Sequence, residues 1–151
     1  MITVLHPMSP TPIPGDLPRT EAEWQARLSP EQFRVLRQHG TERPGSSPLD
    51  KNYAPGNYYC AGCGTLLFTS DTKFNSGTGW PSFYAPVPGA VGTRDDFSYG
   101  MHRVEVHCNT CGGHLGHVFP DGPPPTGQRY CINGVALVFV PAGEAAPMRQ
   151  A

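Results

Sequence analysis

Two short segments share the pattern Cys-x-x-Cys-Gly, and this repeat constrains the fold more than any other feature of the chain. The first occupies residues 60–64 and the second residues 108–112. A Cys-x-x-Cys turn can direct two thiolates at one metal ion, and four thiolates complete the closed tetrahedral shell that Zn²⁺ prefers. We therefore predict one structural Zn²⁺ per chain, held by Cys60, Cys63, Cys108 and Cys111.

Two other interpretations of these four cysteines are weaker. Buried free thiols or a redox dithiol would explain one Cys-x-x-Cys segment but would leave the second unexplained. An iron–sulfur cluster also takes four cysteines, yet the spacing here differs from a ferredoxin-like run. A closed shell of thiolates leaves no open position for water or substrate, so we expect the metal to be structural and to tie two β-hairpins together.

The composition explains why a structural metal would help to stabilise the fold. The 151 residues include 18 Gly and 18 Pro, with 38% hydrophobic residues and no Gly or Pro period. These values are typical of one globular domain that is rich in loops. We expect this domain at residues 17–141, between a disordered Pro-rich tail at 1–16 and a loose C-terminal tail at 142–151.

The charge pattern excludes several kinds of partner. The formal net charge is −1 and there is no Lys/Arg run, so we expect no nucleic-acid and no membrane partner. No stretch approaches the roughly 20 apolar residues of a membrane span, and the first residues lack the features of an export signal. We therefore expect a cytoplasmic location, where thiols stay reduced.

Two short helices are predicted near the N-terminus. Thr20 precedes a glutamate by three residues, which is the spacing of a capping box and predicts a helix over residues 21–28. Ser29 can cap a second helix with Pro30 in its first turn, and Gly40 can end that helix in a left-handed turn.

The remainder predicts a mainly β fold with antiparallel sheets. Short segments bounded by Gly, Pro, Asn and Asp are candidate strands at residues 57–60, 65–68, 101–108, 117–119 and 129–140. The last of these ends in a continuous apolar run, which predicts burial on both faces in the middle of a sheet.

The fifth cysteine, Cys131, lies outside both Cys-x-x-Cys segments. Thiolates form more readily beside cationic or hydrogen-bond-donating groups, which Arg129, His114 and His117 would supply if the fold brings them close. A single cysteine in a strand is about as often a small buried hydrophobic residue. The residues alone leave a reactive thiol and an inert core thiol both open.

Three further segments read SGTGWPSF at residues 76–83, GGHLGHVF at 112–119 and RYCIN at 129–133. Together with the two cysteine segments, they resemble the signature blocks of the zinc-containing B-type methionine-R-sulfoxide reductases. Residues 23–32 and 39–44 resemble the N-terminal region of that family, so the resemblance runs from about residue 17 to residue 141.

The resemblance implies thiol-dependent reduction of methionine-R-sulfoxide in oxidised proteins or peptides, which repairs oxidative damage. Cys131 would attack the sulfoxide sulfur and become a sulfenic acid as methionine is released. His117 and His114 are the candidates for proton delivery, and Asn133 for hydrogen bonding to the oxygen. The candidate substrate-binding residues are Trp80, Phe119 and Arg129. Each candidate also has a structural interpretation, as a backbone-bonded histidine, a core aromatic residue or a member of an ion pair.

The sequence departs from the family at one position. Many members carry a second redox cysteine in the Trp-containing block, where this chain has Thr78. The other cysteines are the predicted zinc ligands, and a disulfide to one of them would dismantle the metal site. We therefore expect the sulfenic acid of Cys131 to be reduced by an external thiol, such as thioredoxin, through a mixed disulfide.

Two other functions remain open on the residues alone. A non-enzymatic zinc-ribbon module would use the same four sulfurs to bind a protein or RNA, but it leaves Cys131 unexplained and the chain lacks a basic patch. A Cys–His acyl-transfer enzyme would use Cys131 and His117, but no oxyanion motif accompanies them.

Overall fold

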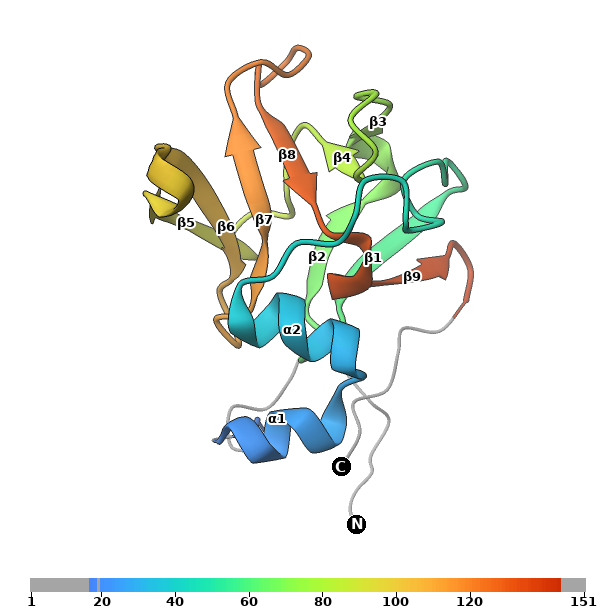
Figure 1. The fold of residues 1–151 in the computed structure, drawn as a ribbon. Helices are drawn as coiled ribbons and strands as arrows, with labels where there is room; N and C mark the ends of the chain where they lie inside the picture. Colours follow the sequence, from blue (N-terminus) through green and yellow to red (C-terminus); the bar gives the residue numbers. More distant parts are fainter. Residues whose placement is uncertain (1–16, 19, 145–151) are drawn as a thin grey trace.

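A computed structural model describes residues 17, 18 and 20–144 of the chain. The predicted tail at 1–16 lies outside these residues, and so does the predicted C-terminal tail beyond residue 144. Two helices come first, α1 at Glu21–Arg27 and α2 at Pro30–Gln38. Figure 1 shows them together at one end of the β-strands. In the described part of the chain, no helix is long and apolar enough to cross a membrane.

Both helices begin where the sequence predicts. The Thr20 hydroxyl accepts a hydrogen bond from the backbone N–H of Glu23 at 3.2 Å. Ser29 and Gln32 form a reciprocal capping box, in which each side chain accepts from the other residue's backbone N–H. These bonds satisfy amide groups that have no partner inside the helix, which fixes the helix starts.

The predicted left-handed turn at Gly40 is wrong by one residue. His39 takes that conformation, with φ of 57°. Histidine tolerates this region better than most residues, and the turn places its imidazole 3.2 Å from the carboxylate of Glu105. Gly40 is needed for a different reason, because a Cβ there would lie 2.9 Å from the carbonyl oxygen of Arg34.

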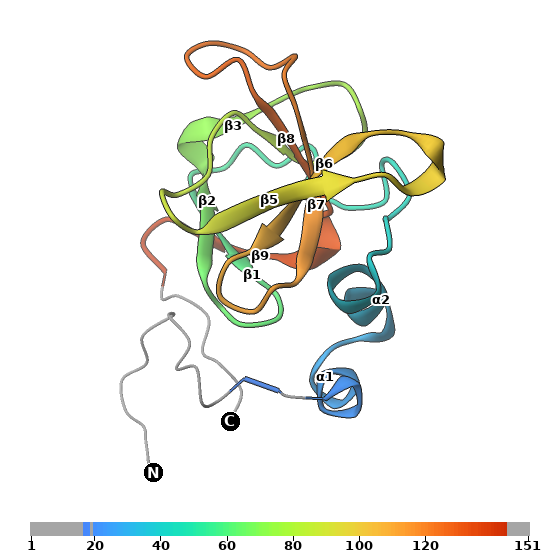
Figure 2. The same cartoon turned by 90° about the vertical axis from the view of Figure 1, so that its left-hand side faces the viewer.

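The rest of the described chain forms two antiparallel sheets, which confirms the predicted fold class. The smaller sheet has the order β2-β1-β9 and the larger the order β3-β4-β8-β7-β6-β5. The strands are β1 Gly56–Cys60, β2 Leu66–Thr69, β3 Lys73–Phe74, β4 Ser82–Phe83, β5 Val91–Asp96, β6 Arg103–Cys108, β7 His114–Phe119, β8 Arg129–Ile132 and β9 Leu137–Pro141. Figure 2 shows the tip of the β5–β6 hairpin projecting from the body of the protein.

The predicted single strand at 129–140 is wrong, because the segment forms two strands in different sheets. After β8 the chain makes one helical turn at Gly134–Ala136 and then enters β9. The Glu42 carboxylate accepts the backbone N–H groups of Gly134 and Val135, each at 2.9 Å, which removes both amides from strand pairing. β9 is an edge strand and most of its residues are half-buried, so the predicted central position is also wrong.

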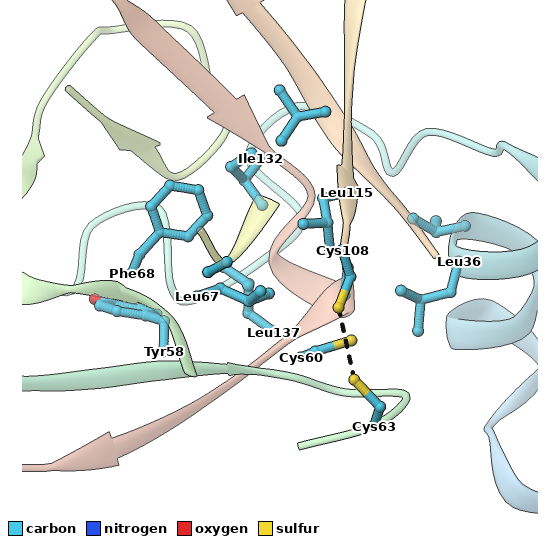
Figure 3. Packing of buried hydrophobic residues seen from close by; sticks show 14 of the residues in the cluster. Leu36, Tyr58, Cys60, Cys63, Leu67, Phe68, Cys108, Leu115, Ile132 and Leu137 are labelled. Atoms are coloured by element: carbon cyan, nitrogen blue, oxygen red, sulfur yellow. Dashed lines mark hydrogen bonds between the residues drawn. The ribbon is translucent and has the colours of Figure 1, made fainter. Parts of the chain in front are cut away.

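The hydrophobic core lies between the two sheets. Tyr58 and Phe68 come from the smaller sheet, and the ring of Phe68 stacks on that of Phe83 with centroids 4.3 Å apart. Leu115 on β7 and Ile132 on β8 are fully buried against them, as Figure 3 shows. The strands that carry the functional residues are therefore anchored by dense apolar packing.

Candidate active site and metal centre

The four cysteines of the repeated segments converge. The sulfurs of Cys60 and Cys111 are 3.8 Å apart, those of Cys63 and Cys108 are 3.6 Å apart, and all four lie within 4.8 Å of one another. Figure 3 shows the sulfurs of Cys60, Cys63 and Cys108 turned toward one another. A tetrahedral shell with Zn–S bonds of about 2.3 Å has sulfur–sulfur edges of about 3.8 Å. The cluster therefore fits a four-thiolate metal ion.

Local backbone geometry explains the glycine that follows each second cysteine. Gly64 and Gly112 have φ of 82° and 75°, a region that favours glycine. Their N–H groups bond to the carbonyls of Cys60 and Cys108, each at 2.8 Å, and close the two turns. The turns connect β1 with β2 and β6 with β7, so the cluster joins a hairpin of each sheet.

Cys131 lines a cavity of about 270 Å³. On β8 it lies opposite His117 of β7 and opposite Ser82 of β4. The cavity wall brings together six of the seven predicted catalytic and substrate-binding residues, with Thr78 beside them. These six are Trp80, His117, Phe119, Arg129, Cys131 and Asn133. His114 is the predicted residue that does not line the wall.

The surroundings of the Cys131 thiol act on its pKa in opposite directions. Burial raises the pKa, since a thiolate loses hydration inside the protein. The hydroxyl of Thr78, 3.9 Å from Sγ, and the guanidinium of Arg129 lower it. Burial is the larger effect, so the pKa of the thiol lies above its usual value.

Arg129 is held at the cavity by two contacts. Its Nε lies 2.8 Å from Oδ1 of Asp121, and its guanidinium carbon lies 4.4 Å from the ring centroid of Phe119. The ion pair with Asp121 raises the pKa of Arg129. The arginine is thus both a member of an ion pair and a cation next to Cys131.

The His117 imidazole has a carboxylate partner that the sequence did not reveal. Its Nε2 lies 2.8 Å from Oδ2 of Asp96, at the end of β5. The bond to His117, assisted by hydrogen bonds from Ser98, holds the pKa of Asp96 far below its usual range. This carboxylate orients the ring beside the cavity.

His114 lies behind the cavity. Its side chain is 2% exposed, and its Nδ1 lies 2.7 Å from Oε2 of Glu105, which also pairs with Arg94 at 2.8 Å. Burial lowers the pKa of His114 and the Glu105 carboxylate opposes that effect. Its Nε2 is buried without a hydrogen-bond partner among the described residues. The ring centroid is 5.4 Å from that of His117, so His114 meets the site through its neighbour.

Glu42 is a second residue that sequence reasoning missed. Its backbone N–H donates to Oδ1 of Asn133 at 2.9 Å, and its carbonyl accepts the indole N–H of Trp80 at 3.0 Å. Asn133 also donates to the carbonyl of Leu115 at 3.0 Å. Glu42 therefore fixes two residues of the cavity wall, and burial raises the pKa of its own carboxyl. Its position in a Pro-rich loop gave no sign of this role.

Comparison with known proteins assigns the family. Residues 28–141 match the SelR domain. The peptide methionine sulfoxide reductase MsrB of Agrobacterium fabrum is 56% identical over 124 residues, which cover 82% of this chain and 92% of that relative. The MsrB protein of Methanosarcina barkeri is 59% identical over 122 residues, covering 80% of this chain and 86% of that relative. The chain belongs to the MsrB family.

Membership of the MsrB family confirms the resemblance seen in the sequence and makes the chain a peptide methionine sulfoxide reductase, an oxidoreductase. The matched residues of the SelR domain contain the whole cavity wall and all four clustered cysteines. MsrB membership also favours this enzyme class over the zinc-ribbon module and the acyl-transfer enzyme.

Proposed function

We propose that the chain reduces methionine-R-sulfoxide in proteins and peptides, with Cys131 as the nucleophile. One observation carries the proposal: Cys131 lies opposite His117 in a cavity walled by Trp80 and Phe119. Sulfoxide reduction needs a thiol, a proton donor and an apolar pocket for the methyl–sulfur end of the substrate. These residue types supply all three.

The substrate would enter with its methyl group against the aromatic wall. Sulfur and methyl groups pack favourably on aromatic rings, and the indole of Trp80 is fixed by its bond to the Glu42 carbonyl. The R epimer follows from the MsrB name of the relatives, since separate enzymes reduce the two epimers of methionine sulfoxide.

The reaction is a transfer of one oxygen atom. The Cys131 sulfur attacks the substrate sulfur, and His117 delivers a proton to the sulfoxide oxygen, which is a poor leaving group until protonated. Asn133 is the candidate hydrogen-bond donor to that oxygen, and His114 supports His117 from behind. In the net reaction the S–O bond of the substrate breaks, an S–O bond forms at Cys131, and two electrons pass to the substrate sulfur. The thiol proton ends on the hydroxyl of the Cys131 sulfenic acid.

The sulfenic acid then waits for a thiol from outside. Thr78 occupies the position beside Cys131 where a resolving cysteine would stand, and the other four cysteines are gathered at the metal centre. An external thiol attacks the sulfenic sulfur, water leaves and a mixed disulfide forms, and a second thiol then releases Cys131. A dithiol protein such as thioredoxin supplies both thiols. A reducing compartment such as the cytoplasm suits this cycle.

The metal centre would hold Zn²⁺ as a structural ion. Four sulfur donors at tetrahedral spacing favour Zn²⁺, and they leave it no open coordination position for substrate. The residues that would hold it are Cys60, Cys63, Cys108 and Cys111. When bound, the ion would join the two hairpins and stabilise the strands that lead to the cavity.

A substrate assay tests the proposed function. The zinc-loaded protein is incubated with peptides that carry either the R or the S epimer of methionine sulfoxide, with dithiothreitol as reductant. We expect the wild type to reduce the R epimer and Cys131→Ser to reduce neither. A wild type that leaves the R epimer unchanged, or a Cys131→Ser variant that retains activity, would contradict the proposal.

A further inference from the structure

Three hydroxyl groups form a chain that ends at the Cys131 thiol. Oγ1 of Thr78 lies 3.9 Å from Sγ of Cys131 and 2.8 Å from Oγ of Ser76. Ser76 lies 2.7 Å from Oγ of Ser82, whose hydroxyl donates to the carbonyl of Trp80 at 3.0 Å. Ser82 is fully buried and lies opposite Cys131 in the β4–β8 pair, so strand pairing fixes this end of the chain.

Counting the available hydrogens shows which group donates in each hydrogen bond between these hydroxyls. Each hydroxyl has one hydrogen to donate, and a carbonyl can only accept. Ser82 donates its hydrogen to the Trp80 carbonyl, so Ser76 is the donor in the hydrogen bond between the two serines. By the same count, the hydrogen between Ser76 and Thr78 belongs to Thr78. Thr78 therefore offers only a lone pair to Cys131, and the thiol S–H is the donor of that contact.

Two backbone amides support this assignment of donors. The N–H of Trp80 points at Oγ1 of Thr78, and the N–H of Thr78 points at Oγ of Ser76, each at 3.4 Å. Both oxygens are thus surrounded by donors. The resting arrangement suits a neutral thiol, which needs an acceptor.

A thiolate reverses the requirement, since it has no hydrogen and accepts hydrogen bonds only. Rotation about the C–O bond of Thr78 turns its hydrogen toward the sulfur, and matching rotations of Ser76 and Ser82 keep the chain connected. No heavy atom moves and no covalent bond changes. The Trp80 carbonyl gives up one hydrogen bond in exchange for a bond to a charged sulfur, which is the stronger kind.

We propose that the Thr78 hydroxyl stabilises the thiolate of Cys131 and that Ser76 and Ser82 hold it in place for that task. Thr78 thereby has a role of its own at a position that lacks a resolving cysteine. The proposal rests on the proposed function in one respect, that Cys131 is the nucleophile.

The other groups that lie near Cys131 or act on its charge are independent of the three hydroxyls. Arg129 on the same strand favours the thiolate, Asp50 in the loop at residues 41–55 disfavours it, and His117 lies opposite on β7. The geometry of these three does not depend on the hydroxyl of Thr78. A change confined to that hydroxyl therefore isolates its contribution to the ionisation of Cys131.

The pH dependence of Cys131 alkylation by iodoacetamide, followed by mass spectrometry of its peptide, tests the proposal. Thr78→Val keeps the shape of the side chain and removes the hydroxyl, and Thr78→Ser retains the hydroxyl. We expect Thr78→Val to slow alkylation about tenfold at pH values below the thiol pKa, the size of one hydrogen bond to a charged group. Thr78→Ser should stay near the wild type. Ser82→Ala should shift the profile in the same direction by a smaller amount.

Two controls make the result decisive. Thr93→Val makes the same substitution on an exposed residue of β5 and should leave the profile unchanged. Equal rates for all variants at high pH, where the thiol is fully ionised, would show that access to the sulfur is unaltered. A Thr78→Val profile that superimposes on the wild type would overturn the proposal. A Ser82→Ala profile that superimposes on the wild type would overturn the supporting role of Ser76 and Ser82. Alkylation needs no sulfoxide, so this result is independent of whether the chain reduces the R epimer.

Discussion

Removal of the Glu42 side chain probes the contact that ties the loop at residues 41–55 to the active site. In Glu42→Ala the backbone N–H groups of Gly134 and Val135 lose their acceptor. A buried donor left without a partner costs about 1–3 kcal/mol, and because Val135 is only half-buried we expect a total of about 2–4 kcal/mol. That is a large part of the roughly 5–15 kcal/mol by which a domain is stable.

Urea unfolding of the zinc-loaded protein measures this loss. Glu31→Ala is the matched control, because Glu31 is exposed and forms its ion pair with Arg34 on the surface of α2. Solvent screens a surface pair of this kind, so its loss should change the free energy of unfolding little. If Glu42→Ala destabilises the protein no more than Glu31→Ala does, the hydrogen bonds from Gly134 and Val135 to Glu42 do not stabilise the fold as argued.

The pH dependence of the same measurement has a defined sign. Burial raises the folded-state pKa of Glu42 above its ordinary value of 4.5, so the folded protein binds this proton more tightly than the unfolded chain. The stability that the folded state gains by binding this proton is fully present below pH 4.5 and is lost as pH rises through the folded pKa. Compared with Glu42→Gln, which cannot ionise, the wild type should therefore lose stability over that interval. A wild type that gains stability relative to Glu42→Gln as pH rises through this interval would contradict the reasoning.

Three further substitutions test other contacts. Asp96→Asn should lower kcat/KM about tenfold, because His117 loses a charged partner that orients its ring, and an unchanged value would remove Asp96 from the site. Thr78→Cys should form a disulfide with Cys131 after one turnover without reductant, since the side chains of residues 78 and 131 are in contact. Mass spectrometry would detect this disulfide, and a sulfenic acid that persists at Cys131 would count against the contact. Cys60→Ser should fall well below one zinc per chain in metal analysis, whereas full retention would contradict the ligand set.

Local patterns in the sequence predicted much of the fold because their causes are local. The two Cys-x-x-Cys-Gly segments close their own turns, and Thr20 and Ser29 cap the helices that follow them directly. Most predicted strands agree with the structure within two or three residues. The prediction missed β3 and β4, which have two residues each, and it missed β5. The β5 sequence, VGTRDD, lacks alternating apolar residues, and β5 is an edge strand of the larger sheet.

Contacts between distant residues could not be predicted in this way. Glu42 bonds to amides more than 90 residues later, and this contact divides the predicted strand at 129–140 into two strands. Asp96 reaches His117 across the β5–β6–β7 strands, and Glu105 is buried because it meets His114 and Arg94. A carboxylate in a loop or on a strand looks solvent-exposed until the fold supplies its partners.

The most direct test of the Cys131 cycle is a single turnover without any external reductant. Reduced, zinc-loaded protein is mixed with an excess of a peptide that carries methionine-R-sulfoxide, and both the methionine formed and the mass of the Cys131 peptide are measured. We predict one equivalent of methionine per chain and one oxygen atom added at Cys131, which a dimedone trap would capture. A disulfide between Cys131 and any of the other four cysteines, or no methionine at all, would contradict the account.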